Sequence, residues 1–421
     1  MILRDIKTDK NYGLSWLVSK FNMGTNLDGF GALMILLTVT ITIDPFIMVS
    51  AFQAGIGVGI SIGVGLMVMT VLSFLLFLKC WSATNSMTYS GVWKDTFGPS
   101  FAWVPSFCVI LAYFSLTTQC TLEFYPDTVE ILTSLSWVDE SKIPSKKVID
   151  IIFMAISLVP IMISHKISSM MVLSTIGNVG LLVGVINVII EFRKKVNLFG
   201  IDPENKLKWW TFDIENIVAS YSYFNTAYFF HPVVYLVLVE MKSVSESQAT
   251  SLLSYNTLVT AIVNIGCGIM GYIMLYDSFE VDVKIMMSFP KNLTTTLLGK
   301  IGAFLSNLTS TTVFILFVSK ELCDLIYVTS SKYDLCRNIS GIVVISCAIA
   351  FSMITESTMN YVWIIGSLAY FFLVFFLPPL FYLKNYSLSN KLWGYIAVSI
   401  MILSIPFFVM EIYYTFIDIS Q

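Results

Sequence analysis

Long apolar runs, separated by short polar stretches, follow one another from Phe30 to Ile417. A helix needs roughly 20 mostly apolar residues to cross a bilayer, and runs such as 171–190 are long enough. The strands of a transmembrane barrel would instead alternate in units of about 10 residues. The pattern therefore predicts an all-α membrane protein. Its eleven expected spans are residues 30–59, 61–80, 100–122, 147–165, 170–192, 213–240, 246–276, 294–328, 337–356, 359–384 and 392–416.

The composition agrees with this pattern. Of the 421 residues, 56% are hydrophobic and only 12% are charged, whereas about 25% of the residues of a soluble domain are charged. An ordinary soluble enzyme and a disordered protein are thereby excluded. The net charge of −3 offers no basic face to a nucleic acid. No catalytic, nucleotide-binding or metal-binding motif occurs, so we expect neither an enzyme nor a cofactor, and any pumping must use an ion gradient.

The distribution of lysine and arginine predicts the orientation. Residues 1–29 are expected to form a short cytosolic segment, and 30–421 a single transmembrane domain. The two short outer connections, near Ile60 and Ser357, carry no positive charge, whereas every short inner connection carries at least one. Positive loops favour the cytosol. We therefore expect a cytosolic N-terminus and place Gln421 on the opposite side.

The first span contains a candidate binding site where its helix is expected to break. Pro45 removes a backbone donor and disfavours helix at the residue before it. That residue is Asp44, an acid near the middle of the bilayer, which is costly there unless it is paired, protonated or hydrated. Thr42, Ile43, Asp44 and Phe46 are candidates for substrate binding, and Asp44 also for ion coupling. The alternative is a kinked helix that Asp44 merely caps.

The sixth span contains a second expected break, at the histidine-proline pair that ends residues 221–232. Transporters often bind their substrate where helices are interrupted near the bilayer midplane. Asn225 and Thr226 have side chains that can bind a carboxylate or an amine. Tyr223 and Tyr228 can line an apolar pocket. An aromatic belt at the membrane interface is the alternative, although these residues lie well inside the span.

The eighth span carries a cluster of hydroxyl and amide side chains within an apolar helix. Its members are Ser306, Asn307, Thr309, Ser310, Thr311 and Thr312. Their oxygens are suitable ligands for a cation, and Thr309 and Thr311 are the candidates for ion coupling. The alternative is that these hydroxyls bond back to their own helix.

Several motifs, in order along the chain, resemble those of the amino acid/auxin permease family. They are Ala51-Phe-Gln-Ala-Gly55, the stretch from Tyr89 to Phe97-Gly98, Ala227-Tyr-Phe-Phe-His-Pro232 with the trailing Glu240-Met, Gly271-Tyr272 with Tyr276, and Gly366 with Pro378-Pro-Leu-Phe-Tyr-Leu-Lys384. The family's first-helix glycine motif is replaced by Thr42-Ile-Asp-Pro-Phe46. The resemblance therefore does not say which amino acid is bound.

The resemblance implies the leucine-transporter-type fold with eleven helices. Helices one to five and six to ten would form a 5+5 inverted repeat, with the first and sixth helices broken around the substrate. It also implies transport of amino acids coupled to sodium or protons. In the sodium-coupled branch a threonine of the eighth helix helps to bind the ion, and Thr311 is the best match, with Thr309 next.

These observations together predict a secondary active amino acid transporter that works by alternating access. The alternative is an amino acid sensor that binds the same ligand without net transport. We expect a monomer in the lipid bilayer, either in the plasma membrane or in a membrane of the lysosome or vacuole type. Its partners would be the amino acid and a sodium ion or proton, and no nucleic acid.

Overall fold

The structure is a computed structural model that describes residues 27–420 except 42–43, 85, 87, 136, 164–166, 202–206, 242–244, 276–283, 291–293, 327–331, 354–355 and 387–390. Within these residues the secondary structure is helical, apart from one β-bridge between Leu27 and Met241. The expected all-α architecture is confirmed. The N-terminal segment 1–29 lies, except for its last three residues, outside the described part, and so do Thr42 and Ile43.

The first half of the chain forms the helices α2 to α8. They are α2 (Gly29–Thr40), α3 (Asp44–Ile47), η1 (Ser50–Phe52), α4 (Ile56–Thr84), α5 (Tyr89–Phe97), α6 (Trp103–Thr133), η2 (Glu140–Lys142), α7 (Lys146–Ile163), η3 (Ile167–Ser169) and α8 (Met170–Phe199).

The second half forms the helices α9 to α16. They are α9 (Ile214–Ala227), α10 (His231–Glu240), α11 (Glu246–Leu275), η4 (Ile285–Ser288), α12 (Thr294–Leu325), α13 (Tyr333–Ser352), α14 (Glu356–Tyr370), the π-helical segment η5 (Phe371–Phe376), α15 (Leu377–Tyr386) and α16 (Lys391–Ser420).

Nine segments of the described chain are long and apolar enough to cross a membrane. Two of the eleven expected spans are not among these nine segments. One is α7, which has three charged residues within its 18 residues. The other is the sixth span, which is divided into α9 and α10. Eleven crossings and the inverted repeat therefore stay predictions.

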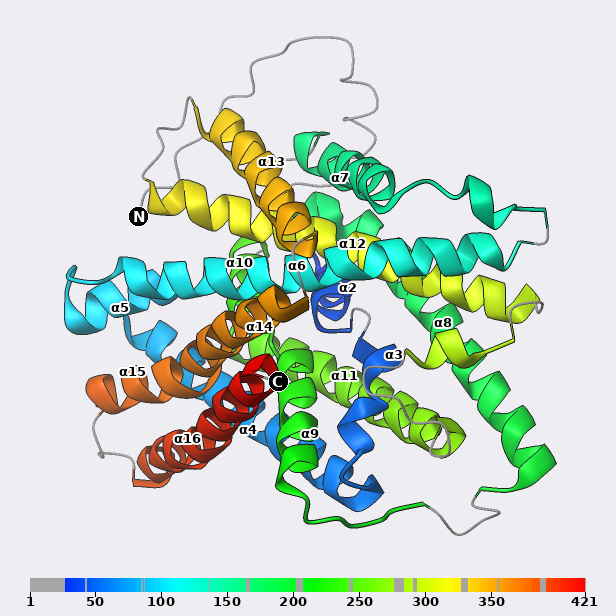
Figure 1. The fold of residues 1–421 in the computed structure, drawn as a ribbon. Helices are drawn as coiled ribbons and strands as arrows, with labels where there is room; N and C mark the ends of the chain where they lie inside the picture. Colours follow the sequence, from blue (N-terminus) through cyan, green and yellow to red (C-terminus); the bar gives the residue numbers. More distant parts are fainter. Residues whose placement is uncertain are drawn as a thin grey trace.

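Helix α2 lies near the centre of the bundle (Figure 1). It begins at the cap Asp28, whose carboxylate accepts a hydrogen bond from the amide of Gly31 at 2.7 Å. It packs against α8, α11, α12 and α10, and its residues from Ile35 to Thr40 are buried. The last turn and a half of α2 is thus enclosed by protein rather than by lipid.

Two long helices approach each other closely beside α2. Gly180 of α8 faces Gly302 of α12, and a Cβ on Gly180 would lie 2.6 Å from the carbonyl oxygen of Gly302. A Cβ on Gly177 would overlap the side chain of Thr309. Small residues at such contacts let helix backbones approach each other inside a membrane. These glycines bring the hydroxyl cluster of α12 next to α8 and α2.

Candidate functional site

The sixth span is broken at Tyr228–Phe230, as the sequence predicts. Asp213 caps the start of α9, and the helix ends at Ala227. Phe230 has a backbone ψ of −5° with φ of −141°, outside the helical range, and α10 starts at the next residue with Pro232 in its first turn. Proline is favoured there because its missing amide would have no helical partner. A break of this kind frees backbone amides and carbonyls for a ligand.

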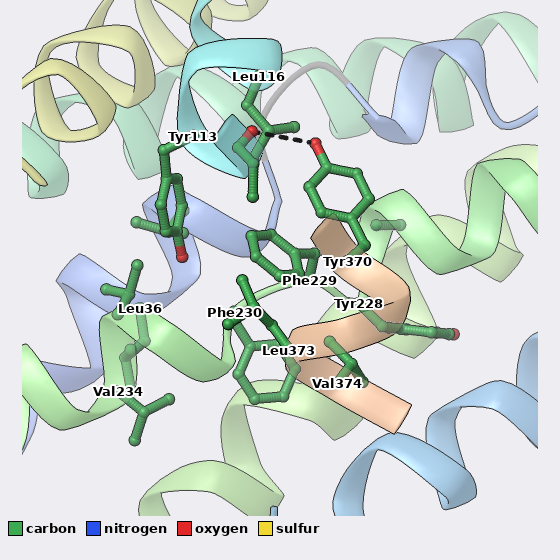
Figure 2. Close-up of a cluster of buried hydrophobic side chains, with 14 of the residues drawn as sticks. Leu36, Tyr113, Leu116, Tyr228, Phe229, Phe230, Val234, Tyr370, Leu373 and Val374 are labelled. Carbon is green, nitrogen blue, oxygen red and sulfur yellow. Dashed lines mark hydrogen bonds between the residues drawn. The ribbon is translucent and has the colours of Figure 1, made fainter. Parts of the chain in front are cut away.

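Aromatic side chains from two other helices, α6 and α14, lie beside this break (Figure 2). The ring of Phe229 lies 4.2 Å from that of Tyr370 on α14 and 5.3 Å from that of Tyr113 on α6, between ring centres. The hydroxyl of Tyr370 donates to the carbonyl of Ala112 across 3.4 Å. Leu36 of α2 belongs to the same cluster of buried side chains (Figure 2). The break therefore faces an apolar, aromatic environment at the bundle centre.

The four candidates of the sixth span, three on α9 and Tyr228 directly after it, have different surroundings. Asn225 is buried, and neither its amide nitrogen nor its amide oxygen has a hydrogen-bond partner among the described residues. The hydroxyl of Thr226 donates to the carbonyl of Ser222 at 3.1 Å. Tyr228 stacks on Phe224, and its buried hydroxyl also has no described partner. Tyr223 is half-buried and packs against the main apolar core.

The C-terminal end of α2 is bound to two neighbouring helices by hydroxyl groups. Ser310 of α12 donates to the carbonyl of Thr38 at 2.7 Å and to that of Ser306 at 2.8 Å. The hydroxyl of Thr38 lies 3.1 Å from the carbonyl of Ser174 and 3.2 Å from the side-chain oxygen of Asn178, both on α8. Six oxygens from α2, α8 and α12 thus gather near the end of α2, which is the ligand chemistry that hard cations prefer.

A third neighbour, α11, binds the last residue of α2. The hydroxyl of Thr40 donates to the side-chain oxygen of Asn256 at 3.2 Å, and that of Thr260 donates to Thr40 at 3.0 Å. All three side chains are buried. The sequence does not single out Asn256 and Thr260, because one polar residue per helical turn in an apolar run does not reveal the helix it will face.

The two candidates for ion coupling bond back to their own helix. Thr309 donates to the carbonyl of Ser306 at 2.9 Å and packs against Gly177. Thr311 donates to the carbonyl of Asn307 at 2.8 Å. Between them in sequence, Ser310 is the residue whose hydroxyl reaches α2. A hydroxyl that donates to its own helix keeps lone pairs with which it can still coordinate a cation.

Of the first-span candidates, Phe46 is the one whose side chain lies in the described part of the chain. Asp44 begins α3, but its side chain lies outside the described part of the chain. Phe46 packs in a second apolar cluster, with Ile285 and Met286, rather than in the core that contains Tyr228. The structure therefore does not place Phe46 in contact with the α9 candidates.

Phe46 instead borders a small cavity beneath a group of ion pairs. The cavity has a volume of about 20 Å³ and is lined by Phe46, Asp127, Glu130, Lys284, Met286, Lys300 and Ala303. Lys284 is bound to Asp127 at 2.6 Å and to Glu123, and Lys300 to Glu130 at 2.7 Å. Burial lowers the pKa of Lys284, but the two carboxylates outweigh it and raise that pKa above its ordinary value. These pairs join α6 to α12 and to the segment before it.

The chain matches the family "transmembrane amino acid transporter protein" over residues 33–420. No curated protein is similar enough to the chain to count as a match. Among solved structures it is similar to a Na+-coupled sialic acid symporter in its substrate-bound, outward-open state, at 11% identity and a TM-score of 0.57, over 91% of this chain and 90% of the symporter. It is also similar to MhsT in complex with L-phenylalanine, at 10% identity and a TM-score of 0.55, over 93% of this chain and 96% of MhsT.

These similarities define the class: an integral, multi-pass membrane protein with the fold of secondary transporters. The chain belongs to the transmembrane amino acid transporter family, since the family match covers most of its length. The expected resemblance and the leucine-transporter-type fold are confirmed. The family is one of transporters, which fits the expectation that the chain is not an enzyme.

Proposed function

We propose that this chain is a secondary active transporter of amino acids, which works by alternating access and is driven by a sodium or proton gradient. One observation carries the proposal: in a chain of this family, α9 and α10 are interrupted at Tyr228–Phe230 beside α2, at the centre of the bundle. An interrupted helix supplies unpaired backbone groups to the ammonium and carboxylate of an amino acid.

The amino acid would bind between the end of α2 and the break in α9 and α10. Asn225 is the strongest candidate contact, because the nitrogen and the oxygen of its buried side-chain amide both lack a hydrogen-bond partner among the described residues. Buried polar groups are normally hydrogen-bonded, so a substrate would supply the missing partners. Tyr223, Thr226 and Tyr228 would complete the α9 side. The segment Thr42–Asp44 would supply the opposite side, with the carboxyl group of Asp44 facing a cationic group or exchanging a proton.

A coupling cation would bind where α2, α8 and α12 meet. The carbonyl of Thr38 and the hydroxyls of Ser310, Thr309 and Thr311 are the candidate ligands, supported by the hydrogen bond that already joins α12 to α2. A cation held there would bias the position of the α2 end, and with it the substrate site. Sodium fits these uncharged oxygens, whereas a proton would need a titratable group.

The test is uptake of labelled amino acids by liposomes that contain the purified protein, with sodium and pH varied separately. Uptake that accumulates the substrate above the outside concentration and needs one of the two gradients supports the proposal. Saturable binding without accumulation under any gradient contradicts it. Epitope tags at the two ends test the proposed cytosolic N-terminus. Tags in cells also show which membrane holds the protein.

A further inference from the structure

A buried acid connects the last helix to the interrupted helix of the substrate site. Glu411 lies on α16 and is only 3% exposed. Ser222 of α9 and Ser367 of α14 both donate to its Oε1 oxygen, Ser367 at 2.8 Å. Ser222 is in turn bound through its carbonyl to the hydroxyl of Thr226, one turn before α9 ends. Glu411 is thus two hydrogen bonds away from a candidate substrate contact.

Among the described residues, no charged side chain compensates for a charge on Glu411. Its second oxygen, Oε2, is buried without a hydrogen-bond partner, and no ion pair reaches the residue in the described chain. From α9, the titratable side chain that faces it is Tyr221, whose ring stacks on Phe407 of α16 at 5.0 Å between ring centres. The described residues of α4, α14, η5 and α15, which also pack against α16, bring no charged partner to it.

An ionised carboxylate in such a place is costly, since it is buried and no cationic side chain of the described residues compensates for it. A protonated one is neutral and still accepts both serine hydrogen bonds on Oε1, with the proton on Oε2. The two serine donors favour the charged form, whereas burial favours the neutral form. Any movement of α9 that takes Ser222 away from Glu411 removes a donor to the charged form and therefore favours the protonated form.

We infer that Glu411 is a proton-binding site of the transporter, which takes up a proton on Oε2 and releases it as α9 moves against α14 and α16. The inference rests on the proposed transport function and adds to it a titratable group that the uncharged cluster around Thr38 lacks. Because coupling between two binding sites is reciprocal, a proton bound at Glu411 changes the affinity of the site at the end of α9 for the amino acid.

The test compares Glu411→Gln with Asp150→Asn in liposomes, with uptake of labelled amino acids measured across a series of pH values. Asp150 is another buried acid, on α7, away from the site. The wild type and Asp150→Asn should show the same pH-dependent uptake, with a midpoint. Glu411→Gln should vary by less than about two-fold across that range, because an amide does not titrate.

Two further variants give readouts that a purely structural role would not move. Glu411→Asp keeps the titration and should retain a midpoint. Ser222→Ala removes a donor to the charged form, so the midpoint should move to higher pH by about one unit. A pH profile that is flat in the wild type, or unchanged in Glu411→Gln, overturns the inference.

Infrared difference spectra separate this inference from the proposed function. A carboxylic acid band that titrates in the wild-type protein and is missing from Glu411→Gln supports the proton site even if no amino acid is accumulated. The absence of such a difference overturns it even if uptake is robust. Failure of uptake under every gradient, by contrast, contradicts the transport function and not the site.

Discussion

Ser310 of α12 donates a hydrogen bond of 2.7 Å to the backbone carbonyl of Thr38 on α2. In the proposed transport cycle, this contact would couple α12, which carries the candidate ligands of the cation, to the end of α2. It also makes Ser310, rather than a threonine beside it, the hydroxyl of the cluster that reaches α2.

If sodium is the coupling ion, Ser310→Ala should weaken the dependence of uptake on sodium more than Thr311→Val does. The reason is that Ser310 reaches the Thr38 carbonyl, whereas Thr311 bonds within α12. We expect the sodium concentration for half-maximal uptake to rise by about ten-fold or more, which corresponds to the loss of about one hydrogen bond. Ser319→Ala is the control, since that buried hydroxyl donates only within α12. Uptake indifferent to sodium in the wild type would remove this hypothesis.

The buried side-chain amide of Asn225 has no hydrogen-bond partner among the described residues. Leaving such a group unpaired costs about 1–3 kcal/mol of stability. Asn225→Leu, of similar volume, should therefore leave the thermal midpoint equal or higher and yet lower uptake by at least about ten-fold if the amide binds the substrate. Asn187→Leu on α8 is the matched control, a buried asparagine that also has no described partner. Its uptake should change little. Normal uptake by Asn225→Leu would exclude the amide as a substrate contact.

Gly180→Ala should separate α8 from α12, because its Cβ would lie 2.6 Å from the carbonyl oxygen of Gly302. We expect a destabilisation of about 1–3 kcal/mol, visible as a lower thermal midpoint. Gly266→Ala in α11 is the control, since a Cβ there meets nothing within 4 Å. It should be neutral or stabilise the helix by up to about 1 kcal/mol. Equal midpoints for the two variants would show that the close contact between the helices contributes little.

Lys284→Met removes the ammonium that binds Asp127 and Glu123. Two carboxylates then face each other without a partner, and we expect a destabilisation of about 3 kcal/mol. Lys94→Met is the control, because Lys94 is exposed on α5, and surface substitutions usually change stability little. Thermal midpoints of the two variants, measured side by side near neutral pH, check this.

The same residue gives the wild type a pH dependence with a defined sign. The pKa of Lys284 is raised in the folded protein. Its stabilisation is therefore complete below the ordinary lysine pKa of 10.5 and is lost as the pH rises through the higher folded value. The thermal midpoint of the wild type should therefore decrease as the pH rises through that alkaline range, and the thermal midpoint of Lys284→Met should decrease less. Parallel curves would contradict the assignment.

The sequence by itself determined where the helices lie and where they break. Apolar run length is a local property, and so are caps and helix breakers. Asp213 therefore predicts the start of α9, and Pro232 predicts the start of α10, without knowledge of the fold. The hydroxyl cluster of α12 and the mid-span position of Asn225 could be read in the same way.

Only the tertiary structure decided which of these side chains meet. Successive residues of a helix point about 100° apart, and a helix that is apolar all round gives no sign of which face meets which neighbour. The sequence could therefore not show that Ser310, rather than Thr309 or Thr311, reaches α2. Nor could it separate Phe46 from Tyr228, or bring Glu411 to Ser222, residues that lie 189 positions apart. Such contacts depend on how whole helices pack against one another, and that packing is set by many side chains from distant parts of the chain together.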